Sequence, residues 1–387
     1  MKLLIITPGK LPVPATSGGA VETLIQILID KNEKDKKHDI TVVSVYTEEA
    51  KIESQKYKNT KFNFIDIDDK LYRISRLCRY IINRIPYIYI GNAFINRVYK
   101  FLKNNKEKYD YVIIENAPQY SLILKKLYKD NLIFHSHNDF LNNKVNMSKK
   151  ILNSYNKVFS LSNYINERIG QIDEKYKKIY TLYNGVDTNK FDIQEDTNLR
   201  KKLGIKKDEF IYLYTGRIVK EKGVKELIES FNKIKDNNSK LIVVGDLKGD
   251  IYTSKKYIKE ILNSSKNNKN IIFTGKVKYK DIPKYYKISN IGIIPSVWEE
   301  PFALTVIEHM AVGNPVIVSN SGAIPELVNK KCAIIVDKNH NYVDNLHRAL
   351  VEIKNNYSHY NHNDIIEQAN KFNSDKYWST FNKLLNK

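Results

Sequence analysis

The chain has 387 residues, of which 42% are hydrophobic and 28% charged, as expected of a folded protein with two ordinary domains. This composition excludes collagen-like, wholly disordered and disulfide-scaffold proteins. The two cysteines, Cys78 and Cys332, are far apart and form no metal-site pattern, which predicts a reducing compartment. Lysine and arginine exceed aspartate and glutamate by 21, which favours an anionic partner, although biased codon usage explains such an excess equally well.

The chain begins with a short apolar run. Lys2–Thr7 is too short for the core of a signal peptide and predicts a first β-strand instead. The sequence contains no run of ~18 apolar residues that could span a bilayer. We therefore expect a cytoplasmic protein, with peripheral binding to the inner face of the cell membrane as an extension of that expectation.

Apolar strands alternate with amphipathic helices along the chain. In the first half the expected strands are Lys2–Thr7, Asp39–Val45, Phe62–Ile67, Tyr111–Glu115, Leu132–His135, Lys157–Leu161 and Lys178–Leu182. In the second half they are Glu209–Thr215, Lys240–Val244, Asn270–Thr274, Ile291–Pro295, Pro315–Ser319 and Ala333–Val336. This alternation predicts the α/β class, with two doubly wound, Rossmann-like parallel sheets covered by helices on both faces.

A polar, strandless stretch follows the turn signal Asn184-Gly185 and marks the expected domain boundary. The two domains are expected over residues 1–190 and 191–371. A last helix over 372–387 carries three large aromatic side chains, so we expect it to pack back on the first domain. Parallel sheets bind ligands outside the carboxyl ends of their strands, so a cleft between two facing domains is the expected site.

The segment Pro295–Ser319 reads as a strand, a loop, a helix from about Leu304 and a second strand. Its loop brings backbone N–H groups to a helix N-terminus, which favours an anion such as a diphosphate. Glu300 stands just outside this helix and Glu308 one turn inside it. Carboxylates suit sugar hydroxyls because each accepts several hydrogen bonds. Alternatively, both glutamates only complement the helix dipole.

Arg217 and Lys222 follow the strand Glu209–Thr215, and the loop between them lets both side chains reach one spot. An arginine fork and a lysine point charge together suit a diphosphate, although both could be solvated surface cations. Gly18 and Gly19 precede the first helix, where glycine lets the backbone approach a ligand. A plain turn before the helix is the alternative for this pair.

His135 and His137 close the strand that starts at Leu132, and they alternate faces, so we expect only one to face the cleft. His137 is favoured because it lies where the strand passes into the loop; a purely structural histidine is the alternative. The H-x-H spacing also suits a metal, but no convincing third ligand is evident. The run Asp66–Asp69 is interpreted as a helix N-cap, so no metal is predicted.

Five of the nine arginines of the chain fall within residues 73–97. Within Lys70–Pro86, Arg73, Arg76 and Arg79 recur every three residues beside a wide apolar side. This pattern is typical of a helix lying in an anionic membrane surface, or of a helix packed on its own domain with a solvated basic face. No nucleic-acid-binding module accompanies it, so no nucleic-acid partner is expected.

Together these segments resemble the retaining glycosyltransferases of family 4, with the GT-B fold, of the bacterial cell-envelope and capsular polysaccharide type. Glu300–Glu308, E-P-F-A-L-T-V-I-E, resembles the E-x7-E motif of that family. Ser17–Glu22 resembles the glycine loop of that family, and His135–Asn138 resembles the end of its histidine-bearing strand. Tyr183–Asp187 resembles its interdomain segment, and Thr215–Gly223 resembles its G-R-x4-K-G phosphate loop. The likeness covers essentially the whole chain. One departure is Ala303, where many members have glycine; alanine fits if its φ is negative.

The resemblance implies a hexosyltransferase that moves a hexose or N-acetylhexosamine, with retention, from a nucleotide-diphosphate sugar. UDP is the favoured carrier, and no metal cofactor is implied. The acceptor would be a glycan or a polyprenyl-diphosphate-linked glycan in cell-envelope polysaccharide synthesis. The resemblance assigns catalysis to His137, Arg217, Lys222 and Glu300. It assigns donor binding to Gly18, Gly19, Arg217, Lys222, Lys276, Val277, Glu300, Phe302, Ala303, Leu304, Thr305 and Glu308.

Within that site the resemblance places the ribose hydroxyls on Glu308 and the hydroxyls of the transferred sugar on Glu300. It places the phosphates on Arg217 and Lys222. Two alternatives remain open. A GT-B nucleotide-sugar epimerase or phosphorylase would keep the phosphate loop without needing the E-x7-E pair. A basic nucleic-acid-binding protein rests on the net charge alone and would not respond to nucleotide-sugars.

Overall fold

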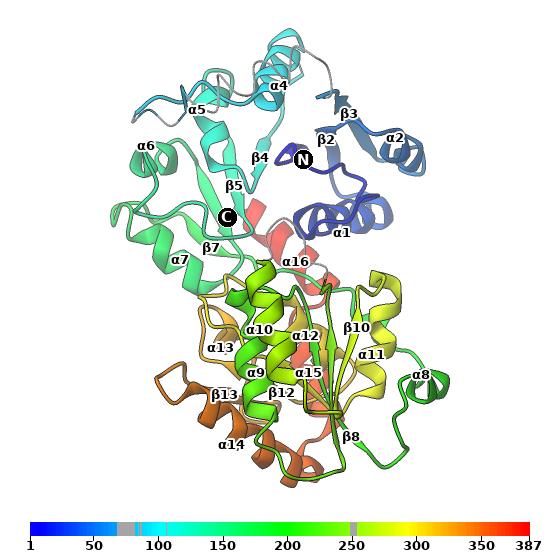
Figure 1. Cartoon of the computed structure of the whole chain (residues 1–387). Coiled ribbons are helices and arrows are strands. Elements are labelled where there is room, and N and C mark those ends of the chain that lie inside the picture. Colours follow the sequence, from blue (N-terminus) through cyan, green and yellow to red (C-terminus); the bar gives the residue numbers. More distant parts are fainter. Residues whose placement is uncertain (68–81, 84, 86, 106, 248–253) are drawn as a thin grey trace. The chain divides into compact units, whose positions relative to one another are not determined.

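A computed structural model describes residues 1–67, 82–83, 85, 87–105, 107–247 and 254–387 (Figure 1). The predicted basic helix over Lys70–Pro86 lies almost wholly outside these residues, as do Asp68 and Asp69 of the acidic run. None of the helices in the described ranges combines the length and the apolar content that a bilayer crossing requires. The chain divides into two compact units, one formed by Met1–Gly185 with Tyr377–Lys387 and the other by Val186–Lys376.

The first unit contains a parallel sheet. Its seven described strands lie in the order β3-β2-β1-β4-β5-β6-β7. They are β1 (Lys2–Ile6), β2 (Asp39–Val45), β3 (Thr60–Ile65), β4 (Tyr111–Glu115), β5 (Leu132–Ser136), β6 (Lys157–Ser160) and β7 (Ile179–Thr181). Central strands are continuous apolar runs because both of their faces are covered; Leu3–Ile6, for example, is fully buried. All seven predicted strands of this half are confirmed to within two residues at each end.

Helices cover both faces of this sheet (Figure 1). They are α1 (Ala20–Asp35), α2 (Glu48–Ser54), α4 (Ala93–Asn104), α5 (Ser121–Leu124), α6 (Ser148–Leu152), α7 (Asn163–Gly170) and α16 (Ser374–Leu385), with a 3-10 turn η1 (Pro118–Tyr120). Helices α1 and α16 share one apolar core with strands β1, β2, β4, β5 and β6. Trp378 of α16 donates to Asp35 at the end of α1 over 2.6 Å. Lys157 of β6 donates to the backbone carbonyl of Leu385, the last residue of α16, over 2.9 Å. The last helix is therefore an integral part of the first unit.

The second unit contains a parallel sheet with six described strands in the order β10-β9-β8-β11-β12-β13. They are β8 (Phe210–Thr215), β9 (Ser239–Val244), β10 (Ile271–Gly275), β11 (Ile291–Ile294), β12 (Val316–Ser319) and β13 (Ala333–Val336). All six were predicted from the second half of the sequence. The α/β class, with two doubly wound Rossmann-like units, is thereby confirmed.

The helices of the second unit also lie on both faces of its sheet (Figure 1). They are α8 (Thr197–Lys202), α9 (Val224–Phe231), α10 (Lys255–Ser265), α11 (Ile282–Ile288), α12 (Leu304–Ala311), α13 (Ile324–Leu327), α14 (Tyr342–Asn355) and α15 (His362–Asn370). Short 3-10 turns connect them: η2 (Thr188–Phe191), η3 (Lys220–Lys222), η4 (Tyr279–Asp281) and η5 (Tyr357–His359). Helices α9, α10 and α14 form one apolar core with the sheet, whereas α12, which follows β11, contributes no residue to that core.

Candidate functional site

A pocket of about 250 Å³ lies at the carboxyl ends of β8 and β11 in the second unit. It is bounded by the loop after β8, the loop after β11 and the first turn of α12. Seven predicted donor-site residues line this pocket, namely Arg217, Lys222, Glu300, Phe302, Ala303, Leu304 and Thr305. The structure thus brings together side chains that are more than 80 positions apart in the sequence.

A close backbone approach joins the two loops. Gly223 has a φ of +67°, and a Cβ placed on it would lie 1.9 Å from the carbonyl oxygen of Pro295. Next to it, the N–H of Val297 donates to the carbonyl of Glu221 over 2.9 Å. Only glycine accommodates both this φ and this contact, so Gly223 sets the distance between Lys222 and the loop after β11.

The backbone of Glu300 is held by a second glycine. A Cβ on Gly322 would lie 2.2 Å from the carbonyl oxygen of Glu300, and the N–H of Ala323 donates to that oxygen over 2.8 Å. The loop that carries Glu300 is therefore supported by the segment that follows β12. This loop cannot shift unless that segment moves as well.

Glu300 is 2% exposed, and one oxygen of its side chain takes part in two hydrogen bonds. Lys222 Nζ lies 2.6 Å from its Oε1, and Ser296 Oγ donates to the same atom over 2.5 Å. A buried carboxylate needs such partners, and a charged donor makes the stronger bond. Lysine has three N–H donors, so Lys222 can keep Glu300 and still donate to an anion in the pocket.

Glu308 lies one turn inside α12 and is 6% exposed. Tyr286 of α11 donates to its Oε2 over 2.5 Å, and the Tyr286 hydroxyl is itself 2.9 Å from Thr215 Oγ1 at the end of β8. A longer contact of 3.4 Å joins Oε1 to the hydroxyl of Tyr279. Burial raises the pKa of Glu308, and the hydrogen bond from Tyr286 opposes that rise.

The remaining predicted residues of this unit lie around the same edge of the sheet. Ala303 has a φ of −124°, so the alanine found in place of glycine is unstrained. The Tyr214 hydroxyl donates to the Arg217 carbonyl over 2.7 Å and supports the start of the loop after β8. Lys276 and Val277 do not line the pocket, but they immediately follow β10 and precede Tyr279, which contacts Glu308.

Gly18, Gly19 and His137 belong to the first unit. There, a second pocket of about 420 Å³ is lined by Gly19 and by residues that follow β1 and β4. A Cβ on Gly18 would meet nothing within 4 Å, whereas one on Gly19, whose φ is +101°, would strike the Glu22 carboxylate. Glu22, in the first turn of α1, is buried against this pocket, and burial raises its pKa.

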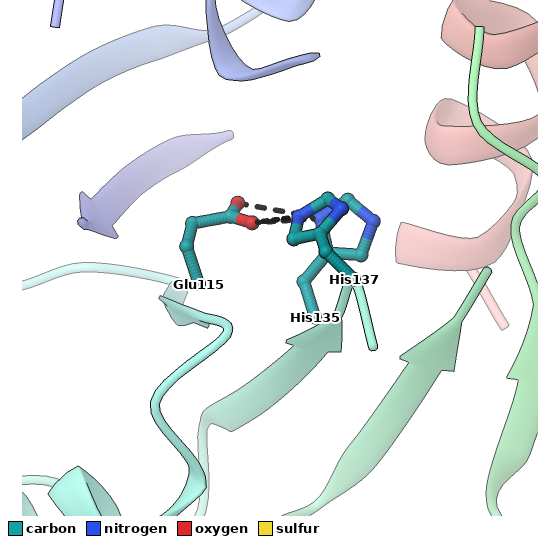
Figure 2. A group of neighbouring side chains, drawn as sticks. All are labelled: Glu115, His135 and His137. Atoms are coloured by element: carbon teal, nitrogen blue, oxygen red, sulfur yellow. Dashed lines mark hydrogen bonds and ion pairs between the residues drawn. The ribbon is translucent and has the colours of Figure 1, made fainter. Parts of the chain in front are cut away.

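His137 lies in a buried cluster with Glu115 and His135 (Figure 2). Glu115 ends β4, His135 lies near the end of β5, and His137 follows that strand. Glu115 Oε2 is 2.7 Å from Nε2 of His137 and 3.0 Å from Nδ1 of His135. Burial alone would raise the pKa of Glu115, but the two histidines outweigh it and lower that pKa to about 2. Burial also lowers the pKa of His137.

The sequence analysis missed Ser296, Tyr286 and Glu115, each of which holds a predicted residue in place. Glu115 had a signal that could have been used: it is an acidic residue directly after the buried apolar run of β4. Ser296 and Tyr286 had none, because a serine in a loop and a tyrosine at an apolar helix position are ordinary residues there.

Two family models match most of the chain. The model described as "Glycosyltransferase Family 4" matches residues 21–190. The model described as "Glycosyl transferases group 1" matches residues 195–372.

Curated relatives match over parts or most of their length. An uncharacterized glycosyltransferase of Methanocaldococcus jannaschii is 32% identical over 177 residues, which is 44% of each chain. The capsular polysaccharide biosynthesis glycosyltransferase CapM of Staphylococcus aureus is 30% identical over 208 residues, 52% of this chain and 53% of CapM. The spore coat protein SA of Bacillus subtilis is 26% identical over 349 residues, 85% and 84% of the two chains.

Among solved structures, HepE of Anabaena in complex with UDP superposes with a TM-score of 0.74 over 100% of both chains. The two sequences are 18% identical, so this likeness concerns the fold.

The close approach at Gly223 predicts a specific loss of stability. Gly223→Ala adds both a strained φ and a backbone clash, whereas Gly204→Ala, at a φ of +66° with nothing within 4 Å, adds only the strain. We expect Gly204→Ala to cost about 1 kcal/mol and Gly223→Ala clearly more. Urea denaturation of both variants measures the difference, and equal losses would contradict the role given to the Gly223–Pro295 contact.

Proposed function

The chain belongs to the glycosyltransferases of family 4, with the GT-B fold, and we propose that it transfers a hexose or N-acetylhexosamine from a UDP-sugar to a glycan or lipid-linked acceptor. The observation that carries the proposal is the pocket where Arg217 and Lys222 meet Glu300 at the start of α12. The capsular polysaccharide relative and the UDP complex of HepE support this choice of pathway class and of nucleotide.

In this proposal the diphosphate lies between the phosphate loop and α12. Arg217 supplies a fork of donors and Lys222 a point charge, while the N–H groups near Leu304 and Thr305 face the anion from the helix N-terminus. The leaving UDP gains negative charge as the glycosidic bond breaks. Cations placed there in advance stabilise that charge without reorganising.

The two glutamates orient the hydroxyl groups of the donor. Glu300, with one oxygen engaged by Lys222 and Ser296, presents its other oxygen to the hydroxyls of the transferred sugar, helped by the N–H groups of Phe302 and Ala303. Glu308 accepts from the ribose hydroxyls, and the base packs near Lys276 and Val277. The reaction keeps the anomeric configuration, as the family resemblance implies.

We propose that the charge on the phosphates is neutralised by Arg217 and Lys222, so that no metal cofactor is required. A cation on the protein is fixed in place by its neighbours: Lys222 is held by Glu300. The requirement can be tested directly, because chelation removes a divalent metal but leaves these side chains unchanged.

We further propose that the first unit, over residues 1–190 with the helix of 372–387, receives the acceptor, and that residues 191–371 hold the donor. The pocket beside Gly19 supports this assignment, since it combines the Glu22 carboxylate with the aromatic side chains of Tyr120 and Phe140. Such a lining suits a sugar, which has both hydroxyls and apolar faces. His137 and the Gly18-Gly19 loop then act on the transferred sugar and the β-phosphate.

The acceptor we favour is linked to a polyprenyl diphosphate, which places the protein on the inner face of the cell membrane. The excess of 21 basic residues supports attraction to an anionic surface. In the described part of residues 70–100, Tyr87 is 81% exposed and lines a shallow depression with Met147, Lys149 and Lys150. Exposed aromatic and lysine side chains together suit a lipid headgroup region.

Calorimetric titration with UDP tests the donor site. We expect wild type to bind UDP, and Arg217→Ala and Glu308→Gln each to weaken binding by roughly tenfold or more, since a hydrogen bond to a charged group contributes about 1.5–3 kcal/mol. Arg348→Ala is the matched control, because Arg348 is also an exposed arginine of the second unit but lies on α14, away from the pocket.

The same titration, repeated with EDTA and with Mg²⁺, tests the cofactor. We expect equal affinities in both buffers. The donor site as proposed is wrong if UDP does not bind, or if Arg348→Ala weakens binding as much as Arg217→Ala. A loss of binding in EDTA would instead contradict the metal-independent mechanism.

Flotation with lipid vesicles tests the membrane proposal. We expect the protein to bind vesicles rich in phosphatidylglycerol and to detach as the salt concentration rises from 0.1 to 1 M, because the screening length falls from about 10 Å to about 3 Å. Vesicles of phosphatidylcholine alone are the control. Equal binding to both vesicle types, or binding to neither, rules the proposal out.

A further inference from the structure

The cluster of Glu115, His135 and His137 is not explained by donor binding in the second unit. Its three side chains come from two neighbouring strands and the loop after one of them, and they point toward one another (Figure 2). Glu115 and His135 are fully buried, and the His137 side chain is 2% exposed. Both oxygens of Glu115 are enclosed, so the carboxylate acts on the histidines and does not touch a substrate.

The distances in the cluster are those of hydrogen bonds. A single carboxylate oxygen, Oε2 of Glu115, lies 2.7 Å from one imidazole nitrogen and 3.0 Å from the other. An ionised carboxylate only accepts, so both nitrogens facing it must carry a proton. Those nitrogens are Nε2 of His137 and Nδ1 of His135.

A metal ion is the competing explanation, because two histidines and one carboxylate are a common ligand set. A tetrahedral ion with bonds of ~2.0–2.1 Å would separate its ligand atoms by about 3.3 Å. The observed separations of 2.7 and 3.0 Å are shorter and leave no room for an ion between the atoms. Protons shared with Glu115 fit the cluster better.

We propose that Glu115 is a positioning residue that fixes the tautomers of both histidines, with the proton of His137 on Nε2 and that of His135 on Nδ1. The opposite ring nitrogens, Nδ1 of His137 and Nε2 of His135, then become acceptors. Both are buried and have no hydrogen-bond partner among the described residues.

The neighbours of the two free nitrogens match this assignment. The Asn184 side chain faces His137 without meeting hydrogen-bond geometry, and the Tyr377 ring stacks beside His135 at 6.2 Å. Asn184 Oδ1 and the Tyr377 hydroxyl also lack partners within the described chain. With its amide turned, Asn184 presents an N–H to Nδ1 of His137, and a substrate hydroxyl would take the place of that donor.

The tautomer of His137 determines what this residue can recognise. With Nδ1 as an acceptor, it receives a hydrogen bond from a hydroxyl or amide and is repelled by a phosphate or carbonyl oxygen. This last step rests on the proposed function: His137 would recognise a hydroxyl of the transferred sugar as the hydrogen-bond donor, and would not bind the diphosphate.

Nitrogen-15 NMR of the full chain labelled in histidine tests the tautomers without any substrate. At pH 8 we expect the His137 proton on Nε2 and the His135 proton on Nδ1. The signals are assigned from His135→Gln and His137→Gln variants. Protons on Nε2 of both residues would overturn the proposal, and so would one equivalent of bound metal in the purified protein.

Glu115→Leu provides the second measurement. Leucine has about the same size but offers no acceptor to either histidine N–H, so we expect at least one of the two histidines to switch its tautomer. Glu167→Leu, which changes an exposed glutamate of α7 in the same unit, is the control and should leave both signals unchanged. Unchanged tautomers in folded Glu115→Leu would also overturn the proposal.

The effect on turnover is measured as the rate of UDP release. For a UDP-sugar substrate, we expect Glu115→Leu to lower turnover by about tenfold or more, the effect of one lost hydrogen bond, while its affinity for UDP stays that of wild type. Turnover equal to that of Glu167→Leu would remove the role of Glu115 in recognition. If the tautomers are as expected but the wild type does not bind UDP, the proposed function fails and the tautomer assignment stands.

Discussion

Two adjacent strands of a parallel sheet leave an open crevice beyond their carboxyl ends when their following helices lie on opposite faces. In the second unit these strands are β8 and β11: α9 joins the core on one face, and α12 does not. In the first unit the two strands are β1 and β4. The helix that follows β1 is α1, which joins the core shared with α16, whereas α5, which follows β4, does not. Both pockets lie at these points, so strand order determines where each unit can hold a ligand.

Three carboxylates near these crevices are each held by a donor from another element. Glu300 is bonded by Lys222 and Ser296, Glu308 by Tyr286, and Glu115 by two histidines. A buried carboxylate without partners would be strongly unfavourable, so the folded state depends on these donors. Their consequence is orientation: a carboxylate with one oxygen engaged has few rotamers left, and its other oxygen points in a defined direction.

The strands and the loop residues of the site could be predicted because they depend on local sequence. A buried parallel strand is a continuous apolar run, as in β1 or β11, and the residues directly after it lie at the carboxyl edge. Arg217, Lys222 and Glu300 are found in this way. The bond of Tyr286 to Glu308 and the cluster of Glu115 with His137 could not be predicted, because each joins elements whose contact depends on the folded sheet.

We propose that the crevice beyond β8 and β11 holds the nucleotide. The most direct test is a crystal structure of the full chain grown with UDP. We expect the diphosphate between Arg217, Lys222 and the first turn of α12, with the ribose hydroxyls at Glu308. UDP bound elsewhere, for example in the pocket beside Gly19, or a diphosphate turned away from α12, would contradict it.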